Sequence, residues 1–185
     1  YGPENIVVST GAKHSLINVF MCILNDGDEV IIPAPYWVSY PEMVGLAGGK
    51  SVVINTDIDS DFKIKPEDIE KAITTNTKAF LFNSPSNPTG SVYTYEELSE
   101  IAKVLVKYPD ILIIADEIYE YITFDSEHHS LGSFPELKDQ LVIVNGVSKG
   151  MAMTGWRVGY IAGPKFIASA CGKLQRSEER RVGKE

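Results

Sequence analysis

The run Ile111-Leu112-Ile113-Ile114-Ala115-Asp116 holds five consecutive apolar residues and then an acid. Side chains along a strand point alternately to the two faces of a sheet, so a strand without a polar position is covered on both faces. Such strands are typical of parallel sheets that lie between layers of helices. The run therefore predicts an α/β fold, with Asp116 at the carboxyl edge of the sheet.

Similar apolar runs alternate with segments of helical periodicity along the rest of the chain. The predicted strands cover residues 6–9, 29–33, 51–54, 79–83, 111–116, 141–145 and 159–162. The predicted helices cover residues 12–24, 37–47, 66–73, 95–107 and 164–174. Thr94 and Glu97 form a candidate capping box before the fourth helix. The pattern predicts a mostly parallel sheet of about seven strands flanked by helices, with ligands bound beyond the carboxyl ends of its strands.

Composition excludes several classes of function. The chain has 185 residues and a formal net charge of -8, without a basic stripe, so nucleic acid is not the expected partner. No apolar run reaches the roughly 18 residues of a membrane span, so no membrane partner is expected. Cys22 and Cys171 give no disulfide framework and suit a reducing, cytoplasmic compartment, where we expect both to be buried.

The two ends of the chain indicate a piece of a longer protein. It begins Tyr1-Gly2-Pro3 without a methionine. Residues 176–185 read RSEERRVGKE and have no apolar face. We expect them to be a solvated charged tail that is foreign to the fold.

Lys149 follows the buried run 141–145, and Arg157 comes shortly after it. A lone lysine at a strand end usually keeps its head in water. Partial desolvation there would instead favour the neutral, nucleophilic amine. The guanidinium is a fixed cation suited to a phosphate. A nucleophilic amine beside a phosphate clamp is what a pyridoxal-phosphate enzyme requires.

Asp116 needs a cationic or hydrogen-bonding partner if it is buried. A protonated pyridine nitrogen would be such a partner, and Tyr119 could reach the phenolic oxygen of the same ring. The alternative for Asp116 is a helix N-cap. A metal site at Asp116-Glu117 is weaker, because no histidine or further carboxylate cluster accompanies the pair in sequence. The histidines, which occur in unrelated contexts, are His14, His128 and His129.

Two turns and one aromatic residue complete the candidates. Thr10-Gly11-Ala12-Lys13 joins a strand to a helix and predicts an anion site, although every such unit needs a turn. It lacks the spaced glycines of a dinucleotide fold. Residues 83–90 contain two prolines and fix Asn87 beyond a strand end, in a cis-proline loop or an ordinary surface turn. Trp37 could stack on a ring, although such an aromatic is more often part of the core or a lid.

Taken in order, these segments resemble the class I/II aminotransferases, which are fold-type-I pyridoxal-phosphate enzymes, and within them the aspartate-aminotransferase-like subgroup. The motifs that carry the resemblance are Asn87-Pro88-Thr89-Gly90, Asp116-Glu117-Ile118-Tyr119, Ser148-Lys149 and Thr154-Gly155-Trp156-Arg157-Val158-Gly159. Their order and spacing make the resemblance specific, and it extends over residues 1–175.

The resemblance implies a role for each candidate residue. Lys149 would form the Schiff base with pyridoxal 5'-phosphate, and Asp116 would pair with the pyridinium nitrogen. Tyr119 and Asn87 would hydrogen-bond the ring oxygen, and Trp37 would stack on the ring. The phosphate would be held by Arg157, Ser148 and the backbone of Gly11, Ala12 and Lys13. Gly146 stands where some relatives carry a phosphate-binding serine.

The resemblance also implies a whole-protein activity. Residues 1–175 would be part of the cofactor-binding large domain, without the N-terminal arm and the C-terminal small domain. The expected reaction is amino-group transfer between an L-amino acid, aspartate-like or aromatic, and a 2-oxo acid, in a cytoplasmic homodimer. Two alternatives stay open: a pyridoxal-phosphate-dependent C–S or β-lyase, and an aminotransferase-like ligand-sensing domain of a regulator.

Overall fold

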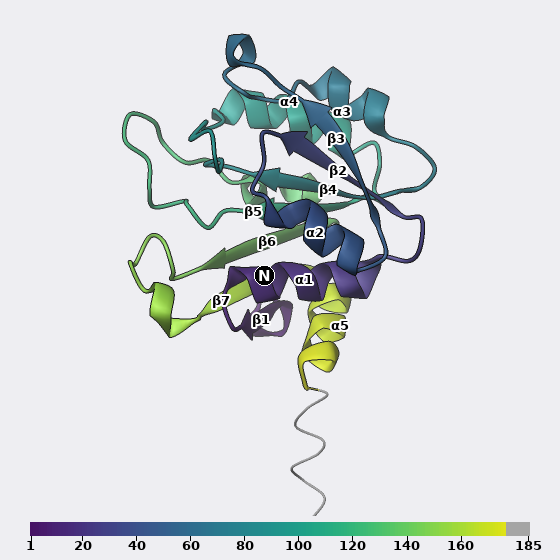
Figure 1. Ribbon diagram of the computed structural model, residues 1–185, viewed down its shortest axis with the longest axis vertical. Helices are drawn as coiled ribbons and strands as arrows, with labels where there is room; N and C mark the ends of the chain where they lie inside the picture. Colours follow the sequence, from purple (N-terminus) through teal and green to yellow (C-terminus); the bar gives the residue numbers. More distant parts are fainter. Residues whose placement is uncertain (177–185) are drawn as a thin grey trace, which may run out of the picture.

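A seven-stranded sheet forms the centre of this computed structural model, which describes residues 1–176 (Figure 1). In spatial order the strands are β1 (Ile6–Ser9), β7 (Gly159–Ala162), β6 (Leu141–Gly146), β5 (Leu112–Asp116), β4 (Thr77–Asn83), β2 (Glu29–Ala34) and β3 (Lys50–Asn55). Strand β7 is antiparallel to both of its neighbours, and the other pairs are parallel. The predicted fold class, a mostly parallel sheet flanked by helices, is confirmed.

Helices cover both faces of the sheet. One face packs against α1 (Ala12–Ile23), α2 (Ser39–Leu46) and α5 (Lys165–Gln175), and the other against α3 (Pro66–Ala72) and α4 (Tyr95–Leu105) (Figure 1). Alternate residues of one strand supply the two cores, because Ile114 faces the first set of helices and Ile113 the second. No described helix has the length and apolar character needed to cross a membrane.

The predicted bounds differ from the observed ones by at most two residues. The largest differences include the second helix, which begins at Ser39, so that Trp37 lies in the segment before it. Of the predicted tail, only Arg176 is among the described residues; residues 177–185 lie outside them. Cys171 is buried as expected, whereas Cys22 is only partly buried; both are free thiols.

The strand register brings five chain segments to one edge of the sheet. Asn83 at the end of β4 pairs with Asp116 at the end of β5. Gly146 at the end of β6 pairs with Gly159 at the start of β7, which pairs in turn with Ser9 at the end of β1. The loops beyond these residues therefore meet at the carboxyl edge, as expected for a ligand site in an open α/β sheet.

Candidate active site

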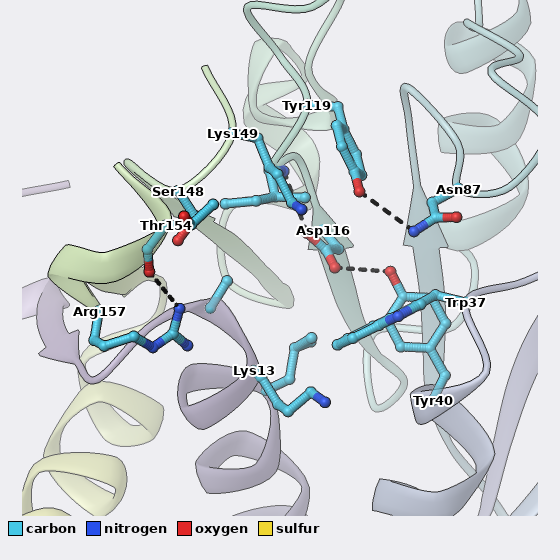
Figure 2. A pocket seen from close by; sticks show the side chains of 13 residues that line it. Lys13, Trp37, Tyr40, Asn87, Asp116, Tyr119, Ser148, Lys149, Thr154 and Arg157 are labelled. Carbon is cyan, nitrogen blue, oxygen red and sulfur yellow. Dashed lines mark hydrogen bonds between the residues drawn. The ribbon is translucent and has the colours of Figure 1, made fainter. Parts of the chain in front are cut away.

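Asp116 lines a cavity at this edge and is 3% exposed (Figure 2). Tyr40 Oη donates a hydrogen bond of 2.7 Å to its Oδ2, and the Ile118 N–H donates one of 3.2 Å to its Oδ1. None of the ion pairs within residues 1–176 involves Asp116. Burial raises the pKa of Asp116 to about 6, although the two hydrogen bonds lower it. A positively charged partner in the cavity would therefore stabilise the ionised form of this carboxyl group.

The helix N-cap interpretation of Asp116 is wrong. The residues that follow it form turns, not a helix. Its bond from the Ile118 N–H closes a local turn of the kind that aspartate side chains commonly make. Asp116 therefore does not cap a helix.

Asn87 and Tyr119 come from separate loops and meet in the cavity. Asn87 Nδ2 donates a hydrogen bond of 3.3 Å to Tyr119 Oη (Figure 2). Asn83 joins the two loops, because its Nδ2 donates to the Asp116 carbonyl at 2.8 Å and its Oδ1 accepts the Asn87 N–H at 2.8 Å. An amide and a phenol are thus fixed on one side of Asp116. We call Tyr40, Asn87, Asp116 and Tyr119 the inner end of the cavity.

Lys149 lies beyond the end of β6, with its Nζ 5.8 Å from the centre of the Tyr119 ring. Its side chain lines the same cavity. Within residues 1–176 the amine forms no hydrogen bond or ion pair with another side chain, and Lys149 is exposed. The partial desolvation expected from its position after a buried strand is therefore not provided by the described residues.

The opposite end of the cavity is built for an anion. Arg157 Nη1 donates to the Thr154 carbonyl at 3.0 Å, and Nη2 donates to the Thr10 carbonyl at 3.5 Å. No described carboxylate pairs with this guanidinium. The first N–H groups of α1, which have no partner within the helix, begin at Ala12. We call Gly11, Ala12, Ser148 and Arg157 the outer end of the cavity.

Glycines allow the close packing of the outer end. Gly11 has φ +89°, and a Cβ atom there would overlap the Arg157 guanidinium. A Cβ atom at Gly159 would overlap the start of α1 at Ala12. At Gly146 a Cβ atom would lie 2.7 Å from the Val158 carbonyl oxygen, so a serine here would require the backbone to shift. The absence of a serine at residue 146 thus has a steric reason.

Trp37 and Lys13 complete the wall of the cavity. Lys13 Nζ lies 4.7 Å from the centre of the Trp37 ring, a cation–π distance. The Trp37 ring meets Tyr40 edge to face, with centroids 5.4 Å apart. The Lys13 side chain is thus engaged with the indole, which leaves its backbone N–H as the group available at the start of α1.

The cavity has a volume of about 320 Å³ and collects nearly all of the predicted site residues. The predicted residues that line it are Ala12, Lys13, Trp37, Asn87, Asp116, Tyr119, Ser148, Lys149 and Arg157. Gly11 lies directly behind Arg157. Residues from five loops or helix starts therefore converge on one space, with a buried carboxyl group at one end and, at the other, a guanidinium that no described carboxylate pairs with.

The comparisons with known proteins agree with this arrangement. The profile of the family described as "Aminotransferase class I and II" matches residues 1–177. The chain belongs to this family. It is 52% identical over 175 residues to the aspartate/prephenate aminotransferase of Nitrosomonas europaea, covering 94% of this chain and 44% of that protein. It is 53% identical over 176 residues to the aspartate aminotransferase of Bacillus subtilis, again covering 94% and 44%.

Solved structures give the same relationship. The aspartate aminotransferase of Rhizobium meliloti superposes with a TM-score of 0.93 at 42% identity, over 95% of this chain and 44% of that one. The chain thus spans less than half the length of the relatives it matches. The comparisons establish the family and the fold of this chain, which corresponds to part of an aminotransferase.

Two residues at or next to this cavity have no role in the expectations drawn from the sequence. Tyr40 lies on α2 and reaches Asp116 across 76 positions of sequence. A tyrosine on a helix is usually part of the hydrophobic core, and the 2% exposure of Tyr40 agrees with that role. The sequence predicts Asn83 as the end of a strand and the start of the two-proline segment, whereas the structure shows that its side-chain amide also joins the two loops of the inner end. In neither case do the neighbouring residues in the sequence indicate which distant residue the side chain will contact.

Proposed function

We propose that this chain forms the cofactor-binding part of a pyridoxal-phosphate-dependent aminotransferase, which moves an amino group from an L-amino acid to a 2-oxo acid. The observation that carries the proposal is the cavity that Lys149, Asp116 and Arg157 share. Membership of the aminotransferase family supports it. So do the names of the relatives described above, which favour transfer over the lyase and sensor alternatives.

The residues present fit pyridoxal 5'-phosphate. Asp116 is a buried carboxyl group without a described cationic partner, and it suits the protonated nitrogen of a pyridine ring. Arg157 is a cation without a described carboxylate partner, next to a helix N-terminus, and it suits a phosphate. When bound, pyridoxal phosphate supplies an aldehyde for covalent attachment and a ring that withdraws electrons from the substrate Cα.

Each residue then has a distinct task. Lys149 would bond to the cofactor through its amine, and once displaced it would move the proton at the substrate Cα. Asp116 would hold the proton on the ring nitrogen. Tyr119 and Asn87 would bind the ring oxygen, and Trp37 would pack on the ring face. The phosphate would be bound by Arg157, Ser148 and the N–H groups of Ala12 and Lys13, with Gly11 leaving room for the guanidinium.

The domain organisation, substrate, assembly and location of the full-length protein are proposed as well. Residues 1–175 would be part of the large domain, with residues 176–185 as an appended tail. An aspartate-like amino acid is the favoured substrate, because relatives in two comparisons are named aspartate aminotransferases; an aromatic one is the second candidate. A cytoplasmic homodimer is proposed on the family resemblance alone. Sedimentation and cell fractionation of the full-length protein test these two points.

Covalent trapping tests the central assignment. The full-length protein, loaded with pyridoxal phosphate, is treated with borohydride and digested, and the modified peptide is identified by mass spectrometry. We expect the reduced adduct on Lys149, and the Lys149→Ala variant should give neither this adduct nor measurable transfer. An adduct on Lys13, the other lysine of the cavity, or retained transfer in Lys149→Ala would contradict the assignment.

A further inference from the structure

A second cluster of polar side chains lies next to the cavity, in the segment that follows Asp116. Glu117, Glu120 and His128 each offer one ligand atom, and these atoms all lie within 4.8 Å of one another. Sequence interpretation separated His128 from the acidic pair and predicted no metal site. The structure corrects that separation, because Ser130 Oγ donates a hydrogen bond of 2.7 Å to Glu117 Oε1 and brings the segment back on itself.

The two ring nitrogens of His128 are buried and have no hydrogen-bond partner among the described residues. Its side chain is 13% exposed, and both ring nitrogens are shielded from solvent and unpaired by any described residue. Buried polar atoms without a partner are uncommon in native proteins and call for an explanation. The charged atom that faces Nε2 is Glu117 Oε2, at 3.6 Å, which is longer than a hydrogen bond.

Glu117 presents a buried oxygen to the same point. Its side chain is 6% exposed, and while Oε1 accepts from Ser130, no described hydrogen bond reaches Oε2. Glu120 forms no ion pair within residues 1–176, and its side chain is partly exposed. Two carboxylates and one imidazole therefore converge, and no described lysine or arginine forms an ion pair with them.

One pair of these ligand atoms lies close to the spacing found around a bound divalent metal ion, and all three lie within 4.8 Å of one another. Zinc binds imidazole nitrogen and carboxylate oxygen at about 2.0–2.2 Å, and tetrahedral coordination then separates two ligand atoms by about 3.4 Å. The distance between His128 Nε2 and Glu117 Oε2 is 3.6 Å. The same bond lengths in an octahedral site give about 3.0 Å between adjacent ligands. An imidazole among the ligands also favours zinc-like ions over magnesium or calcium.

We propose that Glu117, Glu120 and His128 bind one zinc-like divalent metal ion, with a water as the fourth ligand. The ion has a structural consequence. Glu117 directly follows Asp116 in the chain, and Glu120 directly follows Tyr119. A metal ion bound here would therefore fix the return segment, residues 117–130, next to the cavity residues Asp116 and Tyr119, and would act as a positioning element rather than a reactant.

Metal titration tests the proposal. The full-length protein, without an affinity tag, is stripped with a chelator, dialysed and titrated with Zn²⁺ against a chromophoric chelator. We expect one ion per chain in this site and at least about tenfold weaker binding in both His128→Gln and Glu120→Gln. His129→Gln is the matched control: His129 is the adjacent histidine, packs edge-on against Tyr95, and should leave the affinity unchanged. Mg²⁺ and Ca²⁺ at equal concentration should not displace the Zn²⁺.

X-ray absorption of the zinc-loaded wild-type protein supplies a test that does not depend on how the variants fold. We expect only nitrogen and oxygen ligands around the ion, with the scattering signature of a single imidazole. Sulfur ligands would show that the zinc is bound by cysteine and not at this site, and would overturn the proposal. The absence of stoichiometric binding to wild type, or equal affinity in folded His128→Gln, would overturn it as well.

Discussion

The inner and outer ends of the cavity hold their charged groups in different ways. At the inner end Asp116 is 3% exposed and is held by a phenol at 2.7 Å and a backbone N–H at 3.2 Å. At the outer end Arg157 is exposed and is held by backbone carbonyls at 3.0 and 3.5 Å. A charge acts more strongly where water is excluded, and an exposed charge is screened by solvent and salt. The inner end should therefore control reaction rate, and the outer end mainly cofactor affinity.

Removal of the inner carboxyl group should have the largest effect. We expect Asp116→Ala in the full-length protein to lower turnover on the order of 10³-fold, because the ring nitrogen would lose the group that keeps it protonated. Steady-state and single-turnover rates measure this effect. Asp110→Ala is the matched control, since Asp110 is an exposed acid just before the other end of β5. A normal rate in Asp116→Ala would remove the electrostatic role from the inner end.

Removal of the outer cation should act on binding instead. Arg157→Ala should raise the dissociation constant of pyridoxal phosphate about 10- to 100-fold, the range expected for losing a charged hydrogen bond, with a smaller change in turnover at saturating cofactor. Cofactor titrations at low and high salt measure it, and the salt dependence should be weaker in the variant than in wild type. Arg176→Ala serves as the control for general loss of positive charge. If turnover falls more than affinity, the assigned division between the two ends is wrong.

Gly11→Ala tests the outer end without removing its charge. Residue 11 has φ +89° and ψ 159°, a region that is essentially restricted to glycine and costs about 1–3 kcal/mol for other residues. The added Cβ would also displace the Arg157 guanidinium. We expect about tenfold weaker cofactor binding, and little further loss when the change is combined with Arg157→Ala. Gly172→Ala, on α5 with open space around the added atom, should bind cofactor normally. Additive losses in the double variant would show that Gly11 acts independently of the guanidinium.

The same contrast explains how far the sequence predicts the site. Arg157, Ser148 and Gly11 lie in short local motifs, so the outer end could be predicted from nearby residues. The inner end depends on Tyr40, which no local pattern links to Asp116. The exposure of Lys149 depends on which segments cover the loop after β6. The apolar pattern of the strand before it does not indicate which segments these are.

Element boundaries follow a similar rule. Helix α4 begins at Tyr95, as the Thr94–Glu97 capping box predicts, because two side-chain hydrogen bonds fix its start. Helix α2 begins after Val38, which makes no side-chain capping bond, so its first residue had no sequence signal. His128 shows the limit for distant partners: it meets Glu117 only because the intervening segment folds back. Local hydrogen bonds are encoded in adjacent residues, whereas contacts between loops depend on the whole sheet.

The smallest expected effect comes from Tyr40→Phe, which keeps the Asp116 charge but removes its side-chain hydrogen bond of 2.7 Å. We expect a loss of about 1 kcal/mol, about fivefold in cofactor affinity. Burial raises the pKa of Asp116 to about 6 and the Tyr40 bond lowers it, so the pKa should rise further in the variant. Cofactor binding that needs the carboxylate is lost as pH falls through that pKa, and the loss should therefore begin at a higher pH in Tyr40→Phe.

Cofactor titrations across the range of about pH 5 to 8 measure this shift. Tyr93→Phe is the control, because Tyr93 is also a buried phenol, but its Oη accepts the Ile64 N–H outside the cavity. It should cost some stability and leave the pH profile of cofactor binding unchanged. An unshifted profile in Tyr40→Phe would mean that the backbone N–H of Ile118 alone sustains the buried charge. The inner end would then owe its strength to burial, and the phenol would serve only to pack α2 against the sheet.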